Sequence, residues 1–300
     1  MKTRFSGTGV ALVTPFHRYN AIDFGAIEKL VEHVITHHVD YLVVMGTTGE
    51  SATLSQDEKN AVLDFIIELT AGRVPIVKGI GGNNTQEIVD KIKSASFSGI
   101  DAILSVCPYY NKPQQKGIYY HFKTIASVSP VPVILYNVPG RTGCNITAET
   151  TLELARDFSN IVAIKEASGN FAQIMKIVQG KPNGFTVISG DDALTLPLMA
   201  LGVEGVISVV ANAFPAEFSE MVNLCLKGDF ENARKIHYQL NDIINSLFED
   251  GSPAGIKAAL QILDLAQNHL RLPLVKVNKS VFLQINNLIN NYLEIKKSNK

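Results

Sequence analysis

Short hydrophobic segments rich in β-branched residues recur along the chain, roughly 20 to 35 residues apart. The stretches between them carry apolar residues at helical spacing; Ile27, Leu30 and Val34, for example, share one face. This alternation predicts repeated strand–helix units. The predicted strands are Gly9–Val13, Tyr41–Met45, Pro75–Lys78, Ala102–Val106, Val133–Tyr136, Val162–Lys165, Thr186–Ser189 and Gly205–Val209.

Strands that alternate with helices in this number form either a closed barrel or a doubly wound open sheet. Eight units favour the barrel, whose strands are buried on both faces and therefore read as continuous apolar runs. After about Asn223 the strand signals stop, and apolar stripes typical of packed helices or of an interaction surface begin near Ala233 and Ile256. We therefore predict an α/β fold: a (βα)8 TIM barrel at residues 1–224 with a C-terminal helical extension at residues 225–300.

The composition is that of a compact globular protein: of 300 residues, 46% are hydrophobic, and the formal net charge is -1. The chain has no long basic block, so we expect no nucleic-acid partner. The most apolar stretch, Ala193–Ala216, contains Glu204 and is interrupted by Pro197 and Gly202, which argues against a membrane span. Three widely spaced cysteines offer no Cys-x-x-Cys pair and are typical of a reducing, cytoplasmic location.

Lys165 ends the apolar run Ile161–Ile164 and precedes the loop-like residues Glu166–Gly169. At the end of a buried parallel strand, desolvation disfavours the ammonium form and lowers the pKa of a lysine. A neutral amine attacks carbonyl carbons, so Lys165 is a candidate Schiff-base lysine. The alternative is a lysine that extends from the strand end into water. Glu166 follows directly, points to the opposite side and cannot pair with Lys165.

Other predicted strand ends carry polar groups, and in a (βα)8 barrel the carboxyl ends of the strands form the active site. The Gly46–Glu50 turn offers N–H groups and hydroxyls to a carboxylate, although it also reads as an ordinary capped connection. Tyr136 places a phenol at a strand end, and Arg141 provides a guanidinium suited to a carboxylate. The pair Tyr109–Tyr110 follows another strand, although paired tyrosines more commonly pack than react.

Five motifs occur together: Gly46-Thr47-Thr48-Gly49-Glu50, Tyr109-Tyr110-Asn111, Tyr136-Asn137-Val138-Pro139, Arg141-Thr142-Gly143 and Ile164-Lys165-Glu166-Ala167. Jointly and in this order they resemble the dihydrodipicolinate synthase family of pyruvate-dependent class I aldolases, which also contains N-acetylneuraminate lyase. The likeness extends from about Gly7 to the C-terminal helices. It implies a lyase that condenses pyruvate with L-aspartate 4-semialdehyde to 4-hydroxy-tetrahydrodipicolinate, an early step of the diaminopimelate route to lysine.

The resemblance implies a catalytic role for four residues. Lys165 matches the lysine that forms an imine with pyruvate, and Tyr136 matches the tyrosine above it that relays protons. Thr47 and Tyr110 match the other members of that relay. In the family, the residue at the position of Tyr110 reaches into a neighbouring subunit's site, so the resemblance also implies a homotetramer built as a dimer of dimers.

Three further residues match substrate-binding positions of the family. Thr48 matches the residue that holds the pyruvate carboxylate, and Arg141 matches the arginine that binds the carboxylate of aspartate semialdehyde. Ile207 matches a residue whose carbonyl faces the active site. No metal or redox cofactor is implied, because the covalent pyruvate imine on Lys165 serves as the electron sink.

The resemblance also implies a possible feedback site for lysine. Gln56 and Lys59 stand where some lysine-sensitive members carry histidines, and a second cation at position 59 would repel the ammonium group of lysine unless it points away. Sensitivity to lysine therefore stays open. The residues that match lysine-contacting positions are Ala52, Asn83, Glu87 and Tyr109.

Several alternatives compete with this hypothesis. Another pyruvate-dependent lyase or aldolase of the family, acting on N-acetylneuraminate or a keto sugar, would share Lys165 and Tyr136, but Arg141 suits a short acceptor with a carboxylate. A metal-dependent enzyme would need His33 and His37, which share a helix face away from every strand end.

Two further alternatives are a nucleotide-binding protein and a barrel without catalysis. The Gly79–Asn84 run lacks the last glycine of the dinucleotide fingerprint. A barrel that only binds pyruvate, or serves in assembly, is disfavoured by the presence of Lys165 together with all three relay positions.

Overall fold

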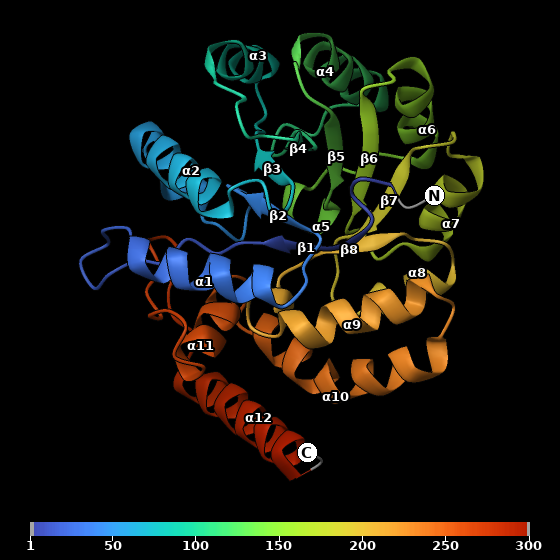
Figure 1. Cartoon of the computed structure of the whole chain (residues 1–300). Helices are drawn as coiled ribbons and strands as arrows, with labels where there is room; N and C mark the ends of the chain where they lie inside the picture. The colour runs from blue at the N-terminus through green and yellow to red at the C-terminus, as the bar shows by residue number, and fades with distance from the viewer. Residues whose placement is uncertain (1–2, 299–300) are drawn as a thin grey trace. The chain divides into compact units, whose positions relative to one another are not determined.

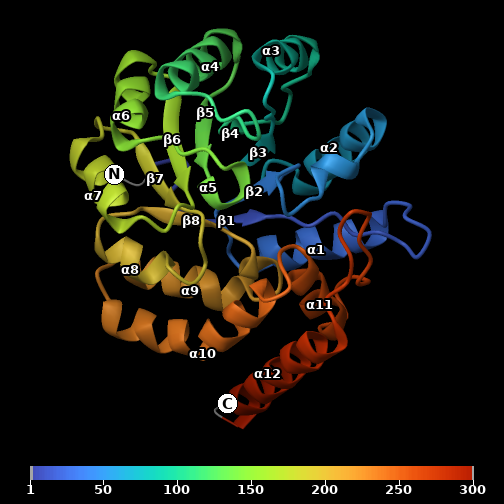
Figure 2. The same cartoon turned by 180° about the vertical axis from the view of Figure 1, so that it is seen from behind.

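All eight predicted strands are present, and they close into a barrel in chain order (Figures 1 and 2). The computed structural model describes residues 3–298, and the pairs from the third strand to the eighth are parallel. The (βα)8 fold predicted from the sequence is therefore confirmed. The strands are β1 (Gly7–Ala11), β2 (Tyr41–Val44), β3 (Ile76–Gly79), β4 (Ala102–Val106), β5 (Val133–Asn137), β6 (Ile161–Glu166), β7 (Thr186–Ser189) and β8 (Gly205–Ser208).

Helices alternate with the strands and continue after β8, as predicted for a helical C-terminal segment. Between the strands lie α1 (Phe24–Thr36), η1 (Ser51–Thr53), α2 (Gln56–Thr70), α3 (Thr85–Ser94), α4 (Gln115–Val128), α5 (Pro139–Thr142), α6 (Ala148–Asp157), α7 (Phe171–Gly180) and α8 (Thr195–Ala200). After β8 come η2 (Val210–Asn212), α9 (Pro215–Leu226), α10 (Phe230–Phe248), α11 (Ala254–Ile262) and α12 (Lys279–Ser298).

The chain divides into two compact units, each built from segments that are distant in sequence. The first unit comprises Met1–Gly9, Asp40–Val43 and Pro75–Ser208, and the second comprises Val10–Val39, Val44–Val74 and Val209–Lys300. Most barrel strands belong to the first unit, and β1 and β2 run from the first unit into the second. The division into a barrel at residues 1–224 and an extension at residues 225–300 stays a prediction.

In the first unit, helices α3, α4, α6 and α7 lie next to one another outside the strands (Figures 1 and 2). Each helix turns an apolar stripe inward: Ile88, Phe122, Leu154 and Ile177 are buried in one continuous core with β4 to β7. Burial of one such side chain stabilises the fold by about 1.5–3 kcal/mol. This packing fixes the carboxyl ends of the strands on which the candidate site depends.

Two glycines allow the first and the last strand to approach each other within the first unit. The N–H of Gly7 donates to the carbonyl oxygen of Glu204 at 2.9 Å. A Cβ atom at Gly205 would overlap the carbonyl oxygen of Gly7, and Gly7 itself has a φ of +91°. Glycine is therefore required at both positions: a side chain at Gly205 would push β8 away from β1, and one at Gly7 would overlap the Asp40 carboxylate.

In the second unit, α1 packs on α2, and α10 packs on both α9 and α12. The stripe predicted from Ala233 onward is the buried face of α10, where Ala233, Leu240 and Ile243 are covered. None of the helices in the described residues is both long and apolar enough to cross a membrane.

Arg271 ties the start of α2 to the C-terminal segment of the second unit. Its guanidinium binds both carboxylate oxygens of Glu58, with one contact of 2.8 Å, and also donates to the backbone oxygens of Asn20 and Thr53. Hydrogen bonds from Arg271 lower the pKa of Glu58 to about 2. A fork-like pair of this kind is stronger than a single contact between opposite charges.

We expect this pair to make unfolding depend on pH. Because the folded-state pKa of Glu58 lies below its unfolded value, the pair stabilises the protein above about pH 4.5 and the effect is lost as the pH falls toward 2. Allowing for partial exposure, the change in unfolding free energy is about 1–2 kcal/mol. Urea unfolding of Glu58→Gln at pH 7 and pH 3 measures it, with Glu68→Gln on the exposed face of α2 as the control. Equal pH dependence in both variants would contradict the assignment.

Candidate active site

Lys165 and Tyr136 lie side by side at the carboxyl ends of neighbouring strands. They are direct partners in the parallel pairing of β6 with β5. Both are buried, with 6% and 8% of their surfaces exposed. The Nζ atom of Lys165 lies 4.5 Å from the centroid of the Tyr136 ring. An amine and a phenol thus share one largely dry environment, as a nucleophilic amine with a proton-exchanging neighbour requires.

Gly190, which follows β7, leaves room for the Lys165 side chain. A Cβ atom at this position would lie 2.6 Å from the Cβ of Ala167 and 3.0 Å from the Cε of Lys165. The Gly190 N–H donates to the carbonyl oxygen of Glu166 at 2.8 Å, which holds the loop against β6. Any larger residue at position 190 would therefore displace the lysine or the loop.

Asn137 and Glu166, the next residues on the two strands, form a separate hydrogen-bond network. The Glu166 carboxylate accepts from the Asn137 side-chain amide at 3.0 and 3.2 Å and from Gln173 of α7 at 3.0 Å. It also accepts from the backbone N–H of Ser168 at 2.8 Å. Successive residues of a strand face opposite sides, so Glu166 is directed away from Lys165, as the sequence predicts.

The loop after β4 lies against α5 and brings Tyr110 close to the segment that carries Arg141. The N–H of Tyr110 donates to the carbonyl oxygen of Thr142 at 3.3 Å. Tyr110 adopts a φ of +75°, and the residue is 87% exposed. A non-glycine residue in this conformation costs about 1–3 kcal/mol. An exposed aromatic side chain held in a strained backbone conformation is typical of a functional position.

The threonines Thr47 and Thr48 lie in the second unit, in the turn that follows β2. The N–H of Glu50 donates to the Thr47 carbonyl oxygen at 3.0 Å, and the Thr14 hydroxyl donates to the Gly49 carbonyl oxygen at 2.7 Å. Thr48 is buried, whereas Thr47 is exposed. The turn is therefore closed by its own backbone and held by one neighbouring hydroxyl.

The remaining predicted site residues are distributed over both units. Ile207 is buried in β8, and Ala52 lies in η1 of the second unit. Asn83 and Tyr109 are brought together in the first unit, because the Asn83 amide donates to the Tyr109 carbonyl oxygen at 3.3 Å. Glu87, on the first turn of α3, accepts from Asn84 at 3.1 Å.

The sequence profile described as the dihydrodipicolinate synthetase family matches residues 4–292. This chain belongs to that family. A 4-hydroxy-tetrahydrodipicolinate synthase of Parabacteroides distasonis is 54% identical over 269 residues, which cover 90% of this chain and 91% of the relative. The family predicted from the motifs is therefore confirmed.

Solved structures of the family have the same fold. The dihydrodipicolinate synthase of Aquifex aeolicus is 42% identical, with a TM-score of 0.93 over 96% of this chain and 98% of that one. The enzyme of Cyanidioschyzon merolae, solved with lysine bound, is 40% identical, with a TM-score of 0.93 over 97% and 99% of the two chains.

In this member of the dihydrodipicolinate synthetase family, Glu50 and Lys257 form a buried ion pair that the sequence did not predict. The Lys257 ammonium contacts the Glu50 carboxylate and donates to the His269 carbonyl oxygen at 2.8 Å. The second Glu50 oxygen accepts from the backbone N–H of Arg271 at 3.1 Å. Burial lowers the pKa of Lys257 to about 8, although Glu50 favours its charged form. The signal in the sequence was Glu50 itself, a carboxylate that ends the Gly46–Glu50 turn.

His33 lies in the last turn of α1, and His37 is the C-cap residue of that helix. The rings of His33 and His37 lie 4.9 Å apart, and burial lowers the pKa of His33. Within residues 3–298, no group of three or more histidine, cysteine, aspartate or glutamate side chains is arranged to hold a metal ion.

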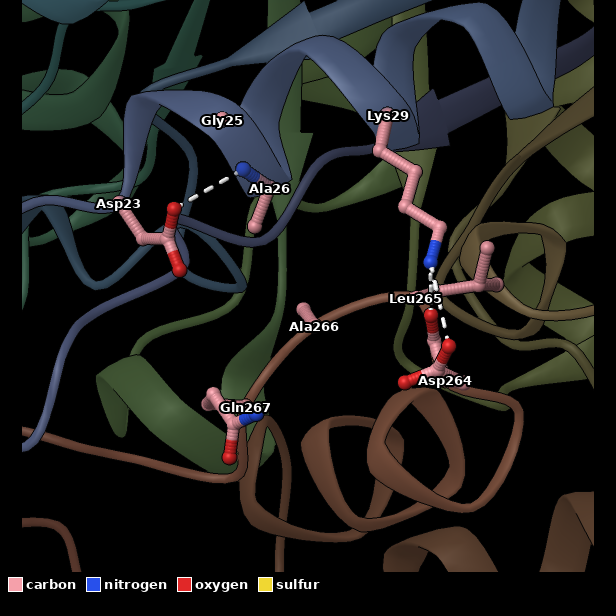
Figure 3. Close-up of a pocket in the computed structure, with 8 residues that line it drawn as sticks. All are labelled: Asp23, Gly25, Ala26, Lys29, Asp264, Leu265, Ala266 and Gln267. Atoms are coloured by element: carbon pink, nitrogen blue, oxygen red, sulfur yellow. Dashed lines mark hydrogen bonds and ion pairs between the residues drawn. The ribbon is translucent and has the colours of Figure 1, made fainter.

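A pocket of about 210 Å³ lies in the second unit, between the start of α1 and residues 264–267 (Figure 3). Its charged groups pair with their neighbours: Lys29 contacts Asp264, and Asp23 accepts from the Ala26 N–H at 2.9 Å. It contains none of the predicted site residues.

Proposed function

We propose that this chain condenses pyruvate with L-aspartate 4-semialdehyde, with Lys165 as the residue that becomes covalently bound. The observation that carries the proposal is the burial of the Lys165 amine 4.5 Å from the Tyr136 ring, at the carboxyl ends of two barrel strands. Three relatives that are 50–54% identical over 90–97% of this chain are named 4-hydroxy-tetrahydrodipicolinate synthase. In a barrel of this kind, chemistry takes place at that end of the strands.

The reaction follows from the chemistry of an imine. The neutral amine of Lys165 attacks the keto carbon of pyruvate, and loss of water gives a protonated imine. The imine withdraws electrons, so a methyl proton can be removed and an enamine forms. Its carbon attacks the aldehyde of aspartate semialdehyde. The amine of the adduct then attacks the imine carbon, which closes the ring and releases Lys165.

Proton transfers occur at several of these steps and need a relay. Tyr136 is adjacent to Lys165 and is the first member, with Thr47 and Tyr110 as the others. A positioned acid–base group of this type contributes about 10²–10⁴-fold to the rate. The overall reaction is redox-neutral and the imine is its own electron sink, so the proposal requires neither a metal nor a redox cofactor.

Two carboxylates must be held during the reaction. Thr48, in the closed turn after β2, is the proposed ligand of the pyruvate carboxylate, and the carbonyl of Ile207 faces the reacting atoms. Arg141 is the proposed ligand of the carboxylate on aspartate semialdehyde. A guanidinium binds a carboxylate through two parallel hydrogen bonds, which fixes the orientation of the acceptor.

We also propose a cytoplasmic homotetramer, assembled as a dimer of dimers. The support is Tyr110, which is 87% exposed in the single chain although its assigned role requires contact with a site. A neighbouring subunit would receive this ring and complete its own relay. Sedimentation of the purified protein tests the assembly, and a monomer with full activity would contradict it.

Regulation by lysine is a further part of the proposal. Asn83, Glu87, Tyr109 and Ala52 are the candidate ligands, and the Asn83–Tyr109 contact already joins two of them. Titration of the purified enzyme with lysine decides whether the chain responds, since Lys59 would repel the ammonium group of the ligand unless it points away from it.

A coupled assay with two acceptors tests the function. Pyruvate is supplied with either aspartate semialdehyde or N-acetylmannosamine, and turnover is expected with aspartate semialdehyde. Turnover with the amino sugar alone would favour the runner-up, a lyase of the N-acetylneuraminate or keto-sugar type. No turnover with either acceptor would contradict both.

Replacing Arg141 by alanine is expected to impair the reaction with aspartate semialdehyde but not the capture of pyruvate. Turnover of aspartate semialdehyde should fall by about 10²-fold, because the acceptor carboxylate loses its charged partner. Borohydride should still trap pyruvate on Lys165, since the imine forms before the acceptor binds. Arg156→Ala on α6 serves as the control. Unchanged kinetics with aspartate semialdehyde in the Arg141 variant would refute the assignment.

A further inference from the structure

We propose that Glu166 is a positioning residue for the reaction. Its carboxylate, tied to Asn137, fixes the placement of Lys165 relative to Tyr136. The inference rests on the proposed function, in which Lys165 and Tyr136 are the groups that touch the substrate. Glu166 itself faces the other side of β6 and acts only through these two residues.

The pairing of β5 with β6 is irregular where the strands begin. Val133 pairs with Ile161, whereas the next residue, Ile134, pairs with Ala163, so β6 contains one extra residue at this point. A slip of one residue turns every later side chain to the other face of the sheet. The pairing at the start of the two strands therefore does not by itself fix the register at their carboxyl ends, and other contacts must do so.

Asn137 and Glu166 provide such a contact. They are direct partners across the two strands, one step beyond Tyr136 and Lys165. The Asn137 amide bonds both oxygens of the Glu166 carboxylate, and the Ala167 N–H donates to the Asn137 carbonyl oxygen at 2.9 Å. With Asn137 and Glu166 held on the helix side of the strands, Tyr136 and Lys165 must face the other side.

Position 166 requires a side chain that can accept hydrogen bonds on both of its terminal atoms. The amides of Asn137 and Gln173 and one backbone N–H all converge on the carboxylate. Neither amide can exchange the positions of its oxygen and nitrogen without losing a hydrogen bond. Asn137 Oδ1 accepts from the Ile146 N–H at 2.9 Å, and Gln173 Oε1 accepts from Asn145 at 2.8 Å. A carboxylate is acceptor-only, whereas a glutamine at this position would direct its own N–H groups at a donor.

Burial makes the network rigid. Glu166 and Asn137 are 1% and 0% exposed. In a buried position, a fully satisfied network holds one geometry, and an unmatched donor is costly. The network also bonds Asn145 and Ile146, in the segment that follows α5, the short helix of Arg141. It therefore joins the two strands that carry Tyr136 and Lys165 to the segment that follows α5.

The variant Glu166→Gln tests the inference, with Glu153→Gln on the exposed face of α6 as the matched control. We expect kcat to fall by about 10–100-fold while the KM for pyruvate changes by less than about threefold, because misplacement affects the transition state more than binding. The rate of borohydride trapping should fall in parallel. Assays are run well below the melting temperature of each variant. A kcat within about twofold of the unaltered enzyme would overturn the inference.

A double-mutant cycle with Asn137→Ala separates positioning from an independent structural role. Because both residues act on the same geometry, the loss of kcat in the double variant should be smaller than the product of the two single losses. Independent, multiplicative losses would overturn the inference. If Glu166→Gln does not fold, Asn137→Ala and Gln173→Ala each remove one amide side chain from the network. Both variants must then show a fall in kcat with little change in the KM for pyruvate, and unchanged kcat in both would overturn the inference.

The unaltered enzyme distinguishes a failure of this inference from a failure of the proposed function. Trapping of pyruvate on Lys165 and turnover of aspartate semialdehyde in the unaltered protein establish the function first. Unaltered kinetics in the Glu166 and Asn137 variants would then reject only the positioning role.

Discussion

Replacing Lys165 by methionine is expected to abolish covalent capture of pyruvate and to lower kcat by roughly 10³-fold or more. Methionine fills a similar volume beside Tyr136 and Gly190 but carries no nucleophile, so the fold should persist. The measurement is the mass of the protein after treatment with pyruvate and borohydride. In the unaltered protein a stable adduct should be located on the peptide that contains Lys165.

Lys176→Met is the matched control for this experiment. Lys176 is exposed on α7 of the same unit, so its loss should leave both the adduct and kcat unchanged. If the Lys165 variant still gained the adduct, another amine would be the nucleophile. If neither protein gained it, the reaction would not pass through an imine, and the roles of Tyr136 and Thr48 would need a different explanation.

The strands could be predicted from the sequence because each is a short, continuous apolar run. Their limits were less certain, as the first strand shows. It was predicted at Gly9–Val13 and is observed at Gly7–Ala11. Leu12 and Val13 are buried just as the strand residues are, so hydrophobicity alone cannot mark where the strand ends.

The short helix α5 illustrates a second limit. Its sequence, Pro139-Gly140-Arg141-Thr142, reads as a loop, because proline and glycine are common in turns. Proline nevertheless suits the first turn of a helix, since its missing N–H would have no partner there. Sequence reasoning placed Arg141 after a strand end but did not indicate the helical turn that presents it.

The candidate site was predictable where the chemistry lies at strand ends and unpredictable where it depends on distant partners. Lys165 and Tyr136 each end an apolar run, and a barrel brings such ends together. Glu166 and Asn137 were visible in the same motifs, yet their pairing depends on the register of two strands. Local patterns do not specify that register.

Replacing Lys257 by methionine is expected to lower the free energy of unfolding by about 3–5 kcal/mol, because it leaves the buried Glu50 carboxylate without its cation. Lys257 and Glu50 have side-chain exposures of 1% and 0%, and the ammonium also lies 4.2 Å from the centroid of the Phe16 ring. Urea unfolding of the variant measures the loss. Lys227→Met, at an exposed position after α9, is the control and should change stability by less than about 0.5 kcal/mol.

A second substitution shows whether the unpaired charge causes the loss. Glu50→Gln in the Lys257→Met background removes that charge and should recover part of the stability, since an uncharged amide costs less to bury than a lone carboxylate. Glu50 ends the turn that carries Thr47 and Thr48, so the same pair that stabilises the second unit also fixes the proposed pyruvate ligand. A Lys257→Met variant as stable as the control would show that the ion pair contributes little to the fold. In that case Arg271 and the Thr14 hydroxyl would suffice to hold the turn.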